Sequence, residues 1–184
     1  MKAPILNTKN HDLKLVEPDV SRDVANSVKW LEGDMGHATL QLMGVTNEHN
    51  KPTTLKDEEE RINSFLTRQD QLNWMIEYQG EVVGSVWVDL EDSDFLASPS
   101  VHIMIGNPEM RGKGLGLASV SSVLNYLKNS GEKTIYSRYL TTNQGSQHLL
   151  SKLGFDSLGA PYKDGDLLFQ NVKLDFNITS ESEN

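Results

Sequence analysis

The stretch from Val101 to Gly116 constrains the fold more than any other part of the chain. The apolar run Val101–Ile105 predicts a strand, and Gly106-Asn107-Pro108 ends it because proline lacks an N–H and glycine relaxes the backbone. The glycine-rich segment Arg111–Gly116 follows, and after it come apolar residues at helical spacing. A strand, a glycine-rich turn and a helix N-terminus favour an anion, because unpaired N–H groups point outward at the positive end of the helix dipole.

Two common phosphate-binding motifs do not fit this segment. A P-loop requires glycine where Asn107 stands and serine or threonine where Gly114 stands. The dinucleotide fingerprint, started at Gly112, requires glycine where Leu117 stands. A glycine-rich surface turn is the remaining alternative. The pattern that fits is Arg-x-x-Gly-x-Gly from Arg111 to Gly116, which resembles the pyrophosphate loop of the GNAT superfamily of N-acetyltransferases.

Length and composition predict one compact domain over residues 1–184, with residues 1–10 and 177–184 flexible. The sequence contains no apolar run long enough to cross a bilayer, and residues 1–14 lack the apolar core of a signal peptide. We therefore expect a cytoplasmic protein with no membrane partner. The absence of cysteine excludes disulfides, thiolate metal sites and a cysteine nucleophile. His37 and His49 are too few for a metal site, so no metal is expected.

The net charge of −9 is unevenly distributed. Residues 101–152 carry a formal charge of +4, so the rest of the chain carries −13, and the segment before Val101 holds 18 acidic and 9 basic residues. A basic segment around a phosphate loop in an acidic protein suits an anionic co-substrate and a cationic acceptor. It argues against nucleic acid as a partner, which would favour a basic face and a positive total. An acidic surface that only aids solubility explains the remainder equally well.

Apolar spacing and turn residues predict the elements of the chain. In the first half these are a strand at Leu13–Val16, a helix capped by Asp19 or Ser21 and ending near Leu31, a long loop from Gly33 to Thr54, a helix from Thr54 to about Leu66, and a hairpin formed by Trp74–Tyr78 and Val82–Leu90. In the second half they are a helix carrying Leu117, Val120, Leu124 and Leu127, a strand at Thr134–Leu140 parallel to the central strand, a short helix capped by Asn143, and a hairpin of Phe155–Leu158 with Leu167–Phe176.

A second segment strengthens the resemblance to the GNAT superfamily. Asn143 and Ser146, followed by Lys152-Leu153-Gly154-Phe155, are similar to the second signature of that family. The helical segment Thr54–Phe65 is similar to the branch that contains ribosomal-protein N-terminal acetyltransferases. The resemblance implies an α/β (α+β) fold, in which a central, mixed and mostly antiparallel sheet of six to seven strands, flanked by about four helices, is splayed at its two central parallel strands.

The resemblance also implies which residues hold acetyl-CoA. The pantetheine arm would lie along the central strand, the pyrophosphate would be held by the glycine-rich loop, and two residues of the second signature would contact the co-substrate from the other side. These cofactor-binding residues are Met104, Ile105 and Gly106, then Arg111, Gly112, Lys113, Gly114, Leu115 and Gly116, and finally Asn143 and Ser146. Asn143 also has a purely structural interpretation as a helix N-cap.

The catalytic residues of the family transfer poorly to this chain. Leu150 stands where many relatives carry a tyrosine acid, and Arg138 stands where some carry a glutamate base. His102, on the central strand, is a candidate base because imidazole titrates near neutral pH, although a histidine held within a strand is the commoner situation. Glu77, Asp89 and Tyr139 are weaker candidates.

The sequence therefore predicts an acetyl-CoA-dependent N-acetyltransferase that transfers acetyl to a primary amine, either a small molecule or a peptide N-terminus, by direct attack in a ternary complex. The alternative is a non-catalytic module with the same fold that senses acyl-CoA. By the resemblance, the acceptor enters between Gly33–Thr54 and the mouth of the cleft. The sequence leaves a homodimer open.

Overall fold

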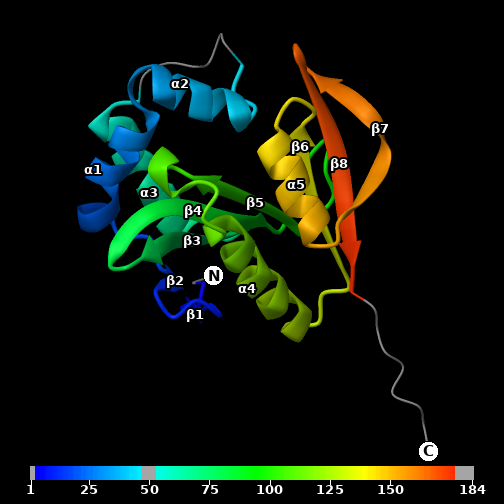
Figure 1. The fold of residues 1–184 in the computed structure, drawn as a ribbon, viewed down its shortest axis with the longest axis horizontal. Coiled ribbons are helices and arrows are strands. Elements are labelled where there is room, and N and C mark those ends of the chain that lie inside the picture. Colours follow the sequence, from blue (N-terminus) through cyan, green and yellow to red (C-terminus); the bar gives the residue numbers. More distant parts are fainter. Residues whose placement is uncertain (1–2, 47–52, 177–184) are drawn as a thin grey trace, which may run out of the picture.

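The computed structural model describes residues 3–46 and 53–176, and within these ranges eight strands form one sheet flanked by five α-helices (Figure 1). The sheet order is β1-β2-β3-β4-β5-β6-β8-β7. The strands are β1 Leu6–Asn7, β2 Leu13–Val16, β3 Gln71–Tyr78, β4 Glu81–Asp89, β5 Ser100–Ile105, β6 Thr134–Leu140, β7 Asp156–Asp164 and β8 Leu167–Asp175. The helices are α1 Val20–Leu31, α2 Gly33–Leu42, α3 Leu55–Thr67, α4 Leu115–Asn129 and α5 Gln144–Lys152, with a 3-10 turn at Pro108–Met110.

The sheet opens between its two central strands. β5 and β6 are parallel, and the described backbone forms one register pair between them, Ser100 with Tyr136. The Ser137 hydroxyl adds a bond of 2.8 Å to the Val101 carbonyl oxygen. Every other neighbouring pair of strands is antiparallel. The pairs that flank the opening, β4 with β5 and β6 with β8, stay in register along their whole length, whereas β3–β4 and β7–β8 each contain one register shift. The splay that the family resemblance implied is therefore present at the predicted strands.

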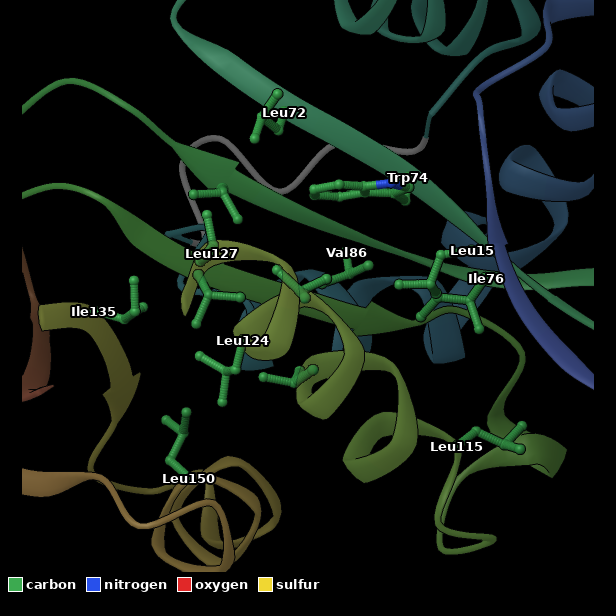
Figure 2. Packing of buried hydrophobic residues seen from close by; sticks show 14 of the residues in the cluster. Leu15, Leu72, Trp74, Ile76, Val86, Leu115, Leu124, Leu127, Ile135 and Leu150 are labelled. Carbon is green, nitrogen blue, oxygen red and sulfur yellow. The ribbon is translucent and has the colours of Figure 1, made fainter. Parts of the chain in front are cut away.

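The larger hydrophobic core lies between the sheet and helices α4 and α5 (Figure 2). Trp74 is fully buried there, and its indole N–H donates to the Pro4 carbonyl oxygen at 2.7 Å. The α4 side chains that enter this core are Leu115, Val120, Val123, Leu124 and Leu127, which recur at helical spacing. This burial fixes α4, and with it the loop that precedes α4, against one face of β5.

A smaller core covers the opposite face of the sheet. Its members come from α1, α3 and strands β2 to β5, and they are Val16, Trp30, Leu31, Ile62, Met75, Val82 and Met104. Side chains alternate along β5, so Val101 and Ile103 face α4 whereas His102 and Met104 face this second side. His102 is thereby placed on the face of the sheet opposite α4.

Three sequence-based expectations about the elements are wrong. Residues 3–10 are not a frayed end, because β1 pairs with β2 and Pro4 accepts the Trp74 bond. The segment from Gly33 to Thr54 is not one long loop, because its first ten residues form α2. The sheet has eight strands instead of six or seven, and the described residues hold five α-helices instead of four. The tail at 177–184 and His49 lie outside the described residues.

The sequence did not predict α2 because two glycines lie within its first four residues. Gly33 adopts a positive φ of 63° at the start of the helix, and the helix has no side-chain bond at its N-cap, Glu32. Gly36 is required by packing, since a Cβ there would lie 2.1 Å from the backbone carbon of Leu31. Glycine usually lowers helix propensity, but here Gly33 with its positive φ lets the chain turn between the end of α1 at Leu31 and the start of α2.

The helices of the described part of the chain are too short or too polar to span a membrane.

We expect Ile62→Ala to lower the free energy of unfolding by about 2–5 kcal/mol, because the fully buried side chain joins α3 to the second core and its loss leaves a cavity. Urea denaturation followed by circular dichroism measures this. The matched control is Leu55→Ala in the same helix, where the side chain is 61% exposed, and we expect a change within about 0.5 kcal/mol. Equal losses in the two variants would contradict the assigned packing of α3.

Candidate functional site

The glycine-rich loop joins the end of β5 to the start of α4, as the sequence predicted. Gly112 and Gly114 adopt positive φ values of 74° and 79°, a region that side chains with a Cβ rarely occupy. Gly116 has an ordinary φ, and a Cβ there would lie 3.6 Å from Ile103 on β5 and from Leu149 on α5. Gly116 thus faces the gap between the two halves of the split sheet.

Most of the backbone donors of this loop are free. Gly114 is the N-cap of α4 and makes no side-chain bond to it, and the first intrahelical bond runs from the N–H of Ala118. Across the described residues, no bond uses the backbone N–H groups from Gly112 to Leu117. The N–H of Arg111 differs from the expectation, because it donates to the Pro108 carbonyl oxygen in the 3-10 turn. An anion at this helix end would therefore meet donors from Gly112 onward.

The Arg111 side chain turns away from the loop toward β5 and α2. Its Nε donates to the Ile105 carbonyl oxygen at 3.0 Å, and a terminal nitrogen donates to the Thr39 hydroxyl at 2.8 Å. Partial burial lowers the pKa of the guanidinium. Arg111 therefore adds a positive charge at the end of β5 and links α2 to the glycine-rich loop.

The three strand residues expected along the pantetheine arm have different surroundings. Met104 is buried in the second core. The Ile105 carbonyl oxygen is occupied by Arg111 in this structure. Gly106 packs against Trp30 of α1 so closely that a Cβ would lie 2.2 Å from the indole ring. The glycine at 106 therefore has a packing reason that is independent of any ligand.

On the other side of the splay, α5 begins as predicted. The Asn143 side-chain oxygen accepts from the Ser146 N–H at 3.0 Å, so Asn143 is the N-cap of α5. Its side-chain nitrogen donates to the Leu42 carbonyl oxygen at the end of α2, at 3.1 Å. Leu150, at the position of the family tyrosine, is buried in the larger core and offers no proton.

A polar pocket of about 440 Å³ lies beside the start of β5. It is lined by side chains from the α3–β3 turn, β3, β4, the β4–β5 loop, β5 and β6, namely Arg68, Asp70, Gln71, Asp89, Glu91, Asp92, Ser93, Leu96, Ser100, His102 and Arg138. The lining therefore draws on both halves of the split sheet. It includes none of the described residues of the 33–54 segment, where the acceptor entrance was expected.

His102 makes several polar and ring contacts in this pocket. Its Nε2 lies 3.1 Å from the Asp89 carboxylate and 3.1 Å from the Ser100 hydroxyl, and its ring stacks on Trp87 at 5.4 Å. Burial raises the pKa of Asp89, but hydrogen bonds from His102 and Gln71 outweigh burial and hold the pKa below its ordinary value. Because an ionised carboxylate only accepts, Nε2 carries the proton of a neutral ring and Nδ1 keeps the lone pair. Nδ1 has no partner within the described residues.

Arg138 lies on β6 and lines the same pocket as His102. The sequence did not predict Arg138 as a site residue, and its only distinction there was that it departs from the family pattern. Its guanidinium lies 4.3 Å from the centre of the Phe169 ring. One terminal nitrogen donates to the Tyr162 hydroxyl at 3.1 Å and to the Asp164 carboxylate at 3.2 Å. The available signal was that Arg138 falls within the predicted strand Thr134–Leu140, which was expected to run parallel to the central strand.

The structure places the three weaker catalytic candidates in different surroundings. Asp89 joins the site through His102. Glu77 forms an ion pair with Lys14 at 2.9 Å between β2 and β3, and Tyr139 packs against the larger core on the face opposite His102. No cluster of three or more metal-ligating side chains occurs in the described ranges.

The curated proteins that match part of this chain include the following two. Uncharacterized protein MJ1062 of Methanocaldococcus jannaschii is 36% identical over 101 residues, which make up 53% of this chain and 20% of that protein. Human alpha/beta-tubulin-N-acetyltransferase 9 is 31% identical over 103 residues, which make up 55% of this chain and 47% of that protein. The aligned region thus spans less than half the length of these curated relatives.

Solved structures share the fold at low identity. RimL, the ribosomal L7/L12 alpha-N-protein acetyltransferase solved in complex with coenzyme A, superposes with a TM-score of 0.77 at 14% identity, covering 94% of this chain and 98% of that chain. The microcin C7 self-immunity acetyltransferase MccE, solved in complex with acetyl-CoA and AMP, gives a TM-score of 0.73 at 14% identity, covering 91% and 94%. The sequence profile described as "Acetyltransferase (GNAT) domain" matches residues 21–156. Because that match covers more than half of the chain, this protein belongs to the GNAT acetyltransferase family.

Proposed function

We propose that this protein is an acetyl-CoA-dependent N-acetyltransferase that acetylates a primary amine, either on a small molecule or at a peptide N-terminus. The observation that carries the proposal is the splay between β5 and β6, which has the uncapped N-terminus of α4 at one end and the His102 pocket at the other. Such an arrangement offers an anion site and a proton acceptor along one strand.

The donor half of the proposal rests on the α4 loop. Backbone N–H groups from Gly112 to Gly116 bind the pyrophosphate, and Lys113 adds charge at an exposed position. The pantetheine arm follows β5 along Met104, Ile105 and Gly106. The arm bonds the Ile105 carbonyl oxygen when Arg111 releases that atom, and it lies beside the Arg111 side chain when Arg111 keeps it. Asn143 and Ser146 contact the co-substrate from α5. Coenzyme A and acetyl-CoA bound to RimL and MccE, which share this fold, support this assignment.

The acceptor half rests on His102. A neutral amine attacks the thioester carbonyl carbon, a C–N bond forms, the C–S bond breaks, and coenzyme A leaves as a thiolate. The proton lost by the amine nitrogen passes to the free Nδ1 of His102. The Asp89 carboxylate holds Nε2–H and stabilises the imidazolium that results. Leu150 cannot protonate the thiolate, so water serves that purpose.

The names of related proteins support an amine at a protein N-terminus, because RimL is described as an alpha-N-protein acetyltransferase. The acidic residues of the pocket, among them Glu91 and Asp92, attract an ammonium before it loses its proton. The alternative is a module that binds acyl-CoA without turnover, and the buried leucine at position 150 is the observation in its favour.

The test combines binding and turnover. Acetyl-CoA should raise Tm, since a ligand at 100 times its Kd adds about 2.7 kcal/mol to the stability of the folded state. A panel of amines, amino acids and N-terminal peptides should then release free thiol. A shift in Tm with no turnover on any acceptor would favour the sensing module. The absence of a shift with acetyl-CoA or coenzyme A at millimolar concentration would contradict the donor assignment.

We expect Gly116→Val to raise the Kd for acetyl-CoA by roughly tenfold or more, because the added side chain enters the gap between Ile103 and Leu149 where the pyrophosphate must approach. Gly114→Val should act similarly, with added strain at its positive φ, and Lys113→Ala should cost less. Isothermal titration calorimetry measures these affinities. The control is Asn125→Val, which adds a β-branched side chain at an exposed position of the same helix. If Gly116→Val and Asn125→Val bind equally well, the loop does not hold the phosphates.

We expect His102→Ala to lower kcat by about 10²–10⁴ near neutral pH, because the amine then loses its positioned proton acceptor. The deficit should shrink as pH rises, since hydroxide and free amine become abundant, and the Kd for acetyl-CoA should not change. Steady-state kinetics from pH 6 to about 10 measures both. His11→Ala, an exposed histidine before β2, is the control. Wild-type rates in His102→Ala at every pH would assign proton removal to water or to another group.

A further inference from the structure

Arg138 and His102 lie opposite each other across the splay. Ser100 pairs with Tyr136 in the parallel register, and His102 and Arg138 each follow two residues later. Because side chains alternate along a strand, both return to the face of their paired predecessors, on the side away from α4. Both line the same pocket. A molecule at the opening of the sheet therefore meets an imidazole from one strand and a guanidinium from the other.

The guanidinium of Arg138 is held in place by an aromatic stack. Phe95 stacks on Tyr162 at 5.3 Å, and Tyr162 stacks on Phe169 at 6.1 Å. Arg138 lies over Phe169 at 4.3 Å and bonds the Tyr162 hydroxyl. The plane of the guanidinium is fixed before any ligand arrives, which reduces the entropy lost on binding.

The protein supplies hydrogen-bond acceptors for only part of the Arg138 guanidinium. One terminal nitrogen makes both hydrogen bonds, whereas Nε and the other terminal nitrogen have no acceptor among the residues that the structure describes. Its ion-pair partner, Asp164, is 37% exposed and contacts it through one oxygen at 3.2 Å. A pair of this kind is weak, so much of the charge is available to a ligand.

The charges of the pocket are divided between its two walls. Asp89, Glu91 and Asp92 come from the β4–β5 side, and Arg138 comes from β6. The other lining arginine, Arg68, is committed to Asp70 through two bonds of 2.9 and 2.7 Å. An acceptor that carries only positive charge would leave the remaining donors of Arg138, those not bonded to Tyr162 or Asp164, without an acceptor.

We propose that Arg138 forms an anion subsite within the acceptor pocket, so that the preferred acceptor carries a carboxylate or a phosphate in addition to its primary amine. The subsite rests on the proposed acetyltransferase function of the same pocket. The amine lies beside His102 and the acidic wall, and the anionic group takes the free donors of the guanidinium. Both oxyanions accept the planar pair of N–H groups that arginine presents.

The experiment compares acceptors that differ only in the anionic group. The phosphate arm is O-phosphoethanolamine against ethanolamine, and the carboxylate arm is a peptide with aspartate against one with asparagine at its second position. In wild-type protein we expect kcat/KM to favour the anionic member of at least one arm by about tenfold or more. The arm with the larger ratio of kcat/KM, anionic member over neutral member, shows whether the subsite prefers a phosphate or a carboxylate. In Arg138→Met both ratios should fall to near one, and Arg138→Lys should restore part of the preference.

Two controls separate the subsite from general effects. Lys173→Met removes one positive charge from β8, where Lys173 pairs with Asp175 outside the pocket, and should keep the wild-type ratios. The Kd for acetyl-CoA should be unchanged in Arg138→Met, and the circular dichroism melt verifies that the variant folds. If the only effect of Arg138→Met is a lower Tm, with ratios unchanged, Arg138 is a structural partner of Asp164 and the proposal is overturned.

The subsite and the acetyltransferase function fail in different ways. If amines are acetylated but neutral members react as well as anionic ones, the subsite is absent and the function stands. If no amine is acetylated, calorimetry with O-phosphoethanolamine and with the aspartate peptide, in the presence of coenzyme A, tests the subsite directly. Binding of either probe to wild type that is lost in Arg138→Met supports the subsite, and no binding of either probe overturns it.

Discussion

The divergence of β5 from β6 is the constraint on which the rest of the structure depends. Two adjacent strands normally satisfy each other's backbone groups along their length, and here that pairing ends after Ser100 and Tyr136. Strand edges left open inside a sheet attract another strand or an extended ligand. The glycine-rich loop follows the end of β5, and the His102 pocket lies beside the start of the same strand.

A sheet that is open at its centre needs bonds that hold its halves at a fixed distance. Within the described residues, three side-chain bonds cross the gap or its ends: Asn143 to the Leu42 carbonyl oxygen, Asn171 to the Phe95 carbonyl oxygen, and Ser137 to the Val101 carbonyl oxygen. The first joins α5 to α2, the second joins β8 to the β4–β5 loop, and the third joins the strands themselves. Two of the three come from asparagine amides, whose short side chains hold a fixed geometry.

α2 has a larger part in this bracing than its length suggests. Its Thr39 accepts from Arg111 of the glycine-rich loop, and its Leu42 carbonyl oxygen accepts from the side chain of Asn143, the N-cap of α5. One short helix therefore contacts the structures on both sides of the opening (Figure 1). After the helix, Gly44 packs against Phe169 so closely that a Cβ would lie 2.6 Å from the ring. Arg138 also lies over that ring, so the segment after α2 and the His102 pocket share a support.

Local sequence determined the elements whose signals are local. The glycines at 112, 114 and 116, the cap at Asn143 and the apolar spacing of α4 predicted the loop, the helix starts and the core face, because turn geometry and amphipathic spacing are properties of short segments. Only the tertiary structure decided the rest. The sequence did not predict α2, because the requirement for glycine at position 36 comes from the close approach of Leu31. It did not predict the proposed role of Arg138, because that role depends on His102, which is 36 residues away along the chain but opposite across the splay. Contacts between distant segments leave no periodic trace in a single sequence, since each partner satisfies its own local pattern equally well without the other.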